Sequence, residues 1–417
     1  LRVNQNLLMI KQQLLRLKEL LPLLTVTPQR TKKSNTIQLA LKLIDYNCHK
    51  NNIRTLLGQS TELLSYEITQ HTAKTGEHYI TNNRSEYFRM FKTAAGGGLI
   101  VGILCILKVL LSKIDTSDFG HAFLYSMNYA MGFIAIYVFG FTLATKQPAM
   151  TASTLARALE EGLSTASKSV KEIKYDAFAR LFARLFRSQF IAFVGNVIIA
   201  FPVSLLGIWL IDKAINYNIA ASKWEKLLYD LSPIDSLAIF HASIAGFFLF
   251  LSGIIAGSVA NRNRHNNIYH RIAEHPFLKL SFGEKKAKKM ASLFERKWAG
   301  VVSNFWFGVF MGSTASVGIF LGLNLDIRHI TFASGNLALG LYGAGFNITP
   351  AMLFWGITGI GIIGLMNFLV SFSLSLLLAF RSRSIPLKEL KQVAISIKHH
   401  FIYSPLKFFY PPIERGV

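Results

Sequence analysis

Six separate apolar blocks, each long enough to cross a membrane as a helix, dominate the chain. A helix needs about 20 apolar residues to span a hydrocarbon core of ~30 Å. The blocks that meet this length lie at residues 94–113, 122–144, 190–211, 237–260, 299–323 and 351–380. Only 16% of the residues are charged, whereas a soluble domain carries about 25%. The sequence therefore predicts an all-α fold, a polytopic transmembrane helical bundle with about six spans.

A seventh apolar segment, residues 331–346, is shorter and is interrupted by Ser334, Asn336 and four glycines. An even number of full spans keeps both ends of the chain on one side of the membrane. We therefore predict that this segment is a re-entrant or short segment that enters from the outer side. Irregular backbone at membrane depth is tolerated only where it is buried in protein or lines a wet cavity.

The placement of lysine and arginine predicts the orientation. Of the 45 basic residues, 39 lie before the first span, in the loops 146–188 and 261–297, or in the tail after residue 380. Such an excess marks the cytoplasmic side of a membrane protein. We expect the N-terminus, both loops and the C-terminus to be cytoplasmic.

Three regions follow from this topology. Residues 1–93 form a helical cytoplasmic region, because leucine and isoleucine recur there at helical spacing. Residues 94–380 form the transmembrane domain, and residues 381–417 form a basic cytoplasmic tail. The chain begins at Leu1 without an initiator methionine, so we expect the first region to be the end of a longer N-terminal domain.

The net charge of +23 bears on the choice of partners. A basic balance can indicate nucleic acid, but the topology already accounts for most of these charges. Basic loops beside spans bind anionic lipid, so we expect membrane lipids rather than nucleic acid as partners, and we leave protein partners and homo-oligomers open. Two cysteines, Cys48 and Cys105, are too few for a zinc site. We expect no metal and no cofactor.

The densest group of polar residues near a membrane edge is our candidate polar cluster. Its members are Asn304, Asp326, Arg328, His329 and Asn336. A broken helix that presents polar backbone to a substrate is typical of transporters. The alternative is an interfacial ion pair between Asp326 and Arg328 with a structural role.

Two further sets of polar residues stand out. The intramembrane set is Lys108, Asn196 and His241, and the juxtamembrane set before the first span is Glu77, His78, Arg84 and Glu86. A charge inside a span costs at least ~2.5 kcal/mol at the bilayer centre, and Asp326 is the partner that we expect for Lys108. The juxtamembrane set is interpreted as a belt of salt bridges.

Five stretches carry a resemblance to known proteins. They read GEHYITNNRSEYFRMFKTAAGGG (76–98), GNVIIAFP (195–202), SNFWFGVFMGS (303–313), LNLDIRHITFASGNLALGLYGAG (323–345) and NFLVSFSLSLLLAFRSR (367–383). Together they resemble a family of bacterial polytopic membrane proteins labelled site-specific recombinase, after a gonococcal recombination-associated protein. The resemblance covers about residues 70 to 385 and implies a multi-pass protein of the bacterial inner membrane with a role associated with recombination.

The sequence does not show the residue patterns that recombinase chemistry requires. A tyrosine recombinase needs a His-x-x-Arg pair and a tyrosine nucleophile in one soluble site, and none of the 11 histidines has an arginine three residues later. A serine recombinase needs a soluble catalytic domain near its start. We recognise no recombinase nucleophile site and expect no cleavage of DNA.

Three functions stay open at this stage. The first is a transporter-like or channel-like bundle with a polar site in its outer half. The second is a non-catalytic envelope scaffold or partner-binding membrane protein. The third is recombination-associated DNA tethering by the basic loops, as the family label implies. A pocket lined by the polar cluster favours the first function, and a filled bundle interior favours the second.

Overall fold

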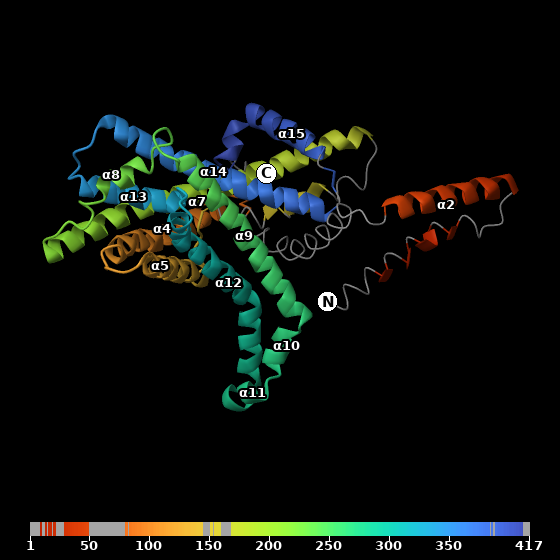
Figure 1. Ribbon diagram of the computed structural model, residues 1–417, viewed down its shortest axis with the longest axis horizontal. Helices are drawn as coiled ribbons and strands as arrows, with labels where there is room; N and C mark the ends of the chain where they lie inside the picture. The colour runs from red at the N-terminus through yellow and green to blue at the C-terminus, as the bar shows by residue number, and fades with distance from the viewer. Residues whose placement is uncertain are drawn as a thin grey trace. The chain divides into compact units, whose positions relative to one another are not determined.

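The computed structural model of the protein is helical, as predicted (Figure 1). It describes residues 80–411 except 82, 145–150, 153, 160–167, 384 and 387, together with 29–49 and short pieces between 9 and 21. No β-strand occurs among these residues. The elements in chain order are α2 (Gln29–His49), α4 (Arg84–Leu111), α5 (Asp118–Val138), α7 (Lys168–Ile215), α8 (Trp224–Tyr229), α9 (Ala238–His265), α10 (Ile268–Ala273), α11 (Pro276–Phe282), α12 (Glu284–Phe320), α13 (Ile330–Gly343), α14 (Pro350–Ser382), α15 (Glu389–Tyr403) and the short 3-10 helix η2 (Pro405–Phe408).

The chain divides into two compact units, Leu1–Thr61 and Glu62–Val417. The first unit contains α2, whose described side chains are mostly exposed. The second unit contains the other helices named above. This division does not test the boundaries expected at residues 93 and 380, which stay predictions.

Four helices are long and apolar enough to cross a membrane. They are α4, residues Tyr175–Ile215 of α7, α9 and α14, and they correspond to four of the six predicted spans. The other two predicted spans fall in α5 and in the second half of α12, which contain polar residues such as Ser126 and Asn304. These two spans stay predictions.

The helices α5 and α12 pack closely because glycines of α12 face the backbone of α5. A Cβ atom added at Gly308 would lie 2.3 Å from the backbone nitrogen of Ala130, and one added at Gly312 would lie 2.2 Å from that of Ser126. Small residues at this spacing let two helices approach to backbone contact. The polar residues of α12 thus belong to a helix that packs closely against α5.

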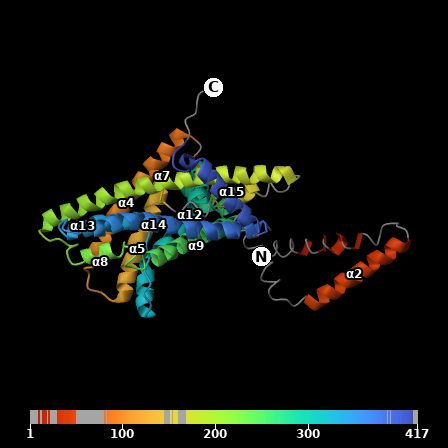
Figure 2. The same ribbon diagram turned by 90° about the horizontal axis from the view of Figure 1, so that it is seen from above.

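The segment predicted to be re-entrant forms α13, a helix of 14 residues. Its length of about 21 Å is less than the ~30 Å thickness of a hydrocarbon core. Eleven of its residues are buried, so the helix lies inside the protein. It contacts α4, α7, α8 and α14, and Figure 2 shows it beside α7 and α14. Its entry from the outer side of a membrane stays a prediction.

The helices α9 and α12 form a hairpin that carries a small helical head, which we define as residues 261–298. The helices α10 and α11 pack on the first part of α12. Only Ala287 and Ala291 are buried within the head. In Figure 1 this part of the hairpin runs at a steep angle to α7 and α14, so that α10 and α11 lie to the side of the bundle.

Candidate functional site

Arg328 lies on the non-helical segment between α12 and α13 and is the centre of a triad of charged side chains. Its Nη2 lies 2.8 Å from Oδ2 of Asp230, and its Nη1 forms an ion pair with Oδ2 of Asp326. Its Nε donates to the backbone carbonyl of Asp230 at 3.4 Å. The side chain of Arg328 is only 9% exposed, that of Asp230 20% and that of Asp326 26%. The pair expected between Asp326 and Arg328 is present, and Asp230 extends it to three charges.

The two carboxylates share one guanidinium, and their pKa values shift in opposite directions. Burial raises the pKa of Asp230 because it removes water from the charged form, and the nearby Asp326 adds repulsion. Burial also acts against the charge of Asp326, but Arg328, Lys108 and the Ile327 N–H outweigh it and lower the pKa of that carboxyl. Asp326 is therefore the lasting counterion of Arg328, and Asp230 is the carboxylate that protonates first.

Lys108 of α4 lies beside this triad. Its Nζ is 5.7 Å from the ring centroid of Tyr125 and 5.6 Å from that of Tyr129, both on α5. A cation over an aromatic ring is stabilised by the ring quadrupole. Asp326 also acts on Lys108 electrostatically, as expected from the sequence. The direct contacts of Lys108 are nevertheless with the two tyrosines.

Asn367, in the middle of α14, holds the start of α13. Its Nδ2 donates to the backbone carbonyls of Ala242 and Arg328, both at 2.9 Å. Its Oδ1 accepts the N–H of Ile330, the first residue of α13, at 3.1 Å. The first N–H groups of a helix have no partner within it. The amide of Asn367 therefore acts as a capping side chain for α13. It joins α9, α13 and α14 at one point.

Asn196 of α7 makes a second connection of the same kind. Its Nδ2 donates to the carbonyls of Ala94 at 2.7 Å and Thr142 at 2.9 Å. Its Oδ1 accepts from the N–H of Ala144 and from the hydroxyl of Thr331, both at 3.0 Å. The side chain uses two donors and two acceptor positions, which is its full capacity. It joins α4, the segment after α5, α7 and α13.

Two histidines support the same segment. His329 precedes α13, and its Nδ1 accepts the N–H of Thr331 at 3.4 Å. The Nε2 of His241, at the start of α9, lies 3.0 Å from the carbonyl of Asn324 and donates to it. The carbonyl of His241 accepts the N–H of Arg328 at 3.3 Å. Both side chains are buried and bind backbone groups of the segment.

The remaining described candidates lie on α4, α12 and α13. Asn304 is buried, and its amide donates to the carbonyl of Gly300 in its own helix at 2.8 Å. Asn336 is partly exposed on α13. Arg84 begins α4, where its guanidinium lies 5.3 Å from the ring of Tyr410. The backbone N–H of Glu86 donates to the side chain of Asn83, the N-cap of α4, at 2.9 Å.

Two of the candidates, Glu77 and His78, lie outside the described residues. Two important residues were missed in the sequence. Asn367 carried the signal that marked Asn196, an amide in the middle of a long apolar block. Asp230 carried no such signal because it lies in a polar connection, 98 residues before Arg328.

These residues form one network of ion pairs and hydrogen bonds whose role is structural. Arg328 and Asn367 hold the non-helical segment, and Asn196 and Asn367 hold the first turn of α13. A buried polar network in which the groups are paired is rigid and specifies one arrangement. The network therefore fixes α13 against α7, α9 and α14.

Comparisons with known proteins place the chain in a family. A search of curated proteins and a search of solved structures each found no match. The model of the family described as "Site-specific recombinase" matches residues 1–411, which is nearly the whole chain and includes the triad, both asparagines and the head. The chain belongs to the site-specific recombinase family.

Proposed function

We propose that the chain is a scaffold protein of the bacterial inner membrane that acts by presenting its helical head to partners in the cytoplasm. In this proposal the apolar helices anchor and position the head, and both termini are cytoplasmic. The gathering of 39 of the 45 basic residues in four segments supports this orientation.

The proposal rests on the hydrogen bonds that two buried asparagine side chains make in the middle of the bundle. The Nδ2 atoms of Asn196 and Asn367 each donate to two backbone carbonyls, and each Oδ1 accepts from α13. A site that handles a substrate directs polar groups at the space where the substrate binds. These groups are directed at the protein's own backbone, which favours a framework over a transport pathway.

Cysteine accessibility at Ser334 tests this proposal. Ser334 is buried on α13, and its hydroxyl donates to the carbonyl of Val197 at 2.8 Å. Ser334→Cys is made in a chain that carries Cys48→Ser and Cys105→Ala, and the intact membrane-embedded protein is treated with a membrane-impermeant thiol reagent. We expect no reaction until the protein is denatured. Asp115→Cys, at an exposed position, is the control that reacts at once.

A transporter that alternates between two states opens its centre to water from one side and then from the other. Rapid labelling of Ser334→Cys from either side of the membrane would therefore refute the scaffold proposal and support transport.

DNA tethering is the second candidate function. The observation in its favour is the composition of loop 261–297, with ten lysines and arginines and three acidic residues. Phosphate contacts release counterions, so tethering predicts that duplex DNA binds the purified full chain with an affinity that falls steeply with salt.

A further inference from the structure

The tip of the head exposes large apolar side chains. In α11, Phe277 is 66% exposed, Leu280 87% and Phe282 50%, and the helix has no buried residue. Met290 and Leu293 of α12 are exposed as well. A contiguous exposed apolar patch marks a binding surface in a soluble part of a protein. An occupant of this tip must therefore offer apolar surface.

The same tip is strongly basic. Lys279 lies in α11, and Lys285, Lys286 and Lys289 are exposed at the start of α12. The other segments assigned to this side of the membrane are basic too, since residues 1–93 hold 14, loop 146–188 holds 8 and the tail holds 7 of the basic residues. A second copy of the chain would bring like charge to the tip. Charge complementarity thus requires an occupant that is negative as well as apolar.

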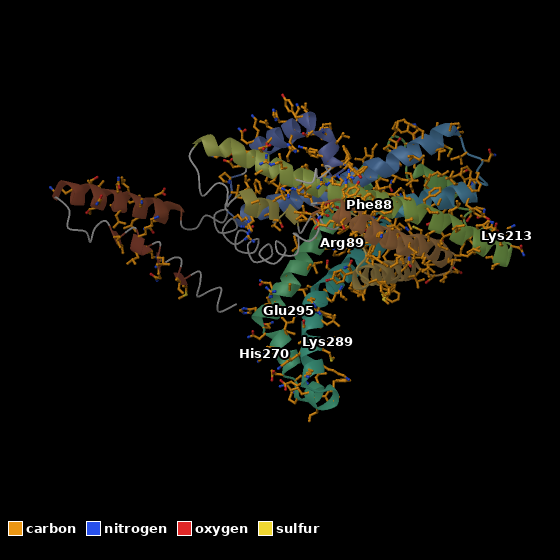
Figure 3. All side chains as sticks on the ribbon, turned by 180° about the vertical axis from the view of Figure 1, so that it is seen from behind. Phe88, Arg89, Lys213, His270, Lys289 and Glu295 are labelled. Carbon is orange, nitrogen blue, oxygen red and sulfur yellow. The ribbon has the colours of Figure 1, made fainter. Side chains whose placement is uncertain are left out.

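The hairpin is inclined to the main helices of the bundle, which tilts the tip toward the membrane surface. The two longest of the four apolar helices, α7 and α14, run in nearly the same direction in Figure 2. If these helices and α9 all cross the membrane, the hairpin, which Figure 1 shows at a steep angle to α7 and α14, leaves the membrane at a tilt and leans toward its surface. Figure 3 shows His270 and Lys289 to the side of the bundle and Lys213 at the far end of α7.

We propose that α11 and the start of α12 dock on the surface of a membrane that contains anionic phospholipid. Phe277, Leu280 and Phe282 enter the interface, and the surrounding lysines contact the phosphate groups. The inference rests on the proposed function for the cytoplasmic placement of the head. A short element with exposed aromatic and leucine side chains and with lysines beside them has the composition of an interfacial anchor. Duplex DNA satisfies the lysines but leaves the apolar side chains in water.

The test uses the full chain in nanodiscs that hold one copy each. Leu280→Cys in the chain with Cys48→Ser and Cys105→Ala is labelled with the fluorophore NBD, which shifts to the blue in apolar surroundings. The discs contain phosphatidylcholine alone or with phosphatidylglycerol, and brominated lipids serve as quenchers. We expect a blue shift and strong bromine quenching with phosphatidylglycerol, and a loss of both with phosphatidylcholine alone or in high salt.

Charge variants separate electrostatic docking from simple burial. Lys285→Glu, Lys286→Glu and Lys289→Glu together should abolish the response to phosphatidylglycerol, and arginine at the same three positions should retain it. All three positions are exposed, so equal thermal unfolding of the variants confirms that the fold is intact. Label at Asn266→Cys, in the exposed turn before α10, is the matched control and should show little quenching.

Three results would overturn the inference. A blue shift without bromine quenching means that protein covers the tip, either another part of the chain or a second copy. Equal spectra in the two kinds of disc mean that anionic phospholipid does not hold the tip. A shift that appears only after duplex DNA is added means that DNA is the partner. None of these results alters the labelling of Ser334→Cys, so the docking and the scaffold proposals can fail independently.

Discussion

Replacing Arg328 by methionine tests whether the ion triad holds the bundle together. Arg328→Met keeps most of the aliphatic stem and removes the charge and every donor. Asp230 and Asp326, which are 20% and 26% exposed, then share a site without a counterion. Breaking a fully buried pair costs about 3–5 kcal/mol. Both carboxylates keep some water and Asp230 can take up a proton, so we expect a loss near the lower end, about 3 kcal/mol.

The compensating variant decides whether this loss comes from stranded charge. Arg328→Met combined with Asp230→Asn and Asp326→Asn removes all three charges and leaves side chains of similar size. Replacing a whole buried ion cluster by neutral groups is often close to neutral. We expect the triple variant to lose about 1 kcal/mol, clearly less than Arg328→Met alone, because residues in direct contact do not contribute additively.

Thermal and denaturant unfolding of the purified proteins in one detergent measure both losses. The wild type, the three single variants and the triple variant are compared at neutral pH and at two salt concentrations. Exposed ion pairs are worth less than about 1 kcal/mol and weaken with salt. If Arg328→Met costs less than about 1 kcal/mol and the single losses add up to that of the triple variant, the triad faces water and does not hold the structure.

The other predictions concern the amide network, the two carboxylates and the topology. Asn367→Leu removes three hydrogen bonds and leaves buried backbone groups unpaired, so it should cost about 3 kcal/mol or more; the partly exposed Asn336 is the control, and Asn336→Leu should change unfolding by less than about 1 kcal/mol. At neutral pH, Asp230→Asn should cost less than Asp326→Asn, because the pKa of Asp230 is raised and that of Asp326 is lowered. The gap between the wild type and Asp326→Asn should close as the pH falls, since a lowered pKa gives stability that is lost as the carboxylate is protonated. A reporter fused after Arg383 should report the cytoplasm, and a signal from the opposite side would contradict the orientation.

The helical class could be predicted because helix length and apolar composition are local properties. Segments with few polar residues, such as α4 and α14, can be recognised as helices from the sequence alone. The helix α13 was expected as a short segment for the same reason, since Ser334 and four glycines interrupt residues 331–346. The assignments of α5 and α12 are weaker because their small polar residues lower the hydropathy while they serve packing between the two helices.

The candidate site was harder to predict, because the sequence shows only which polar residues are close to one another along the chain. It correctly linked Asp326 to Arg328, which are two residues apart. It also put Asn304 and Asn336 with them, whereas Asn304 donates to the carbonyl of Gly300 in its own helix and Asn336 is partly exposed on α13. Asp230 and Asn367 reach Arg328 through the packing of α8, α9 and α14, and contacts made by packing leave no local pattern in a single sequence.

The position of the two asparagines follows from where the backbone leaves regular structure inside the bundle. The segment before α13 and the segment after α5 both present N–H and carbonyl groups that no helix pairs, and such groups must find partners when water is absent. Asn367 serves the first segment and Asn196 the second, and both also bind the first turn of α13. Since α7 and α14 each carry one of these amides, α13 is held between the two longest apolar helices, and the triad of Arg328 secures the connection that leads into it. Motion of α13 would therefore break bonds at all three places together, which is the physical reason to assign this helix to the framework.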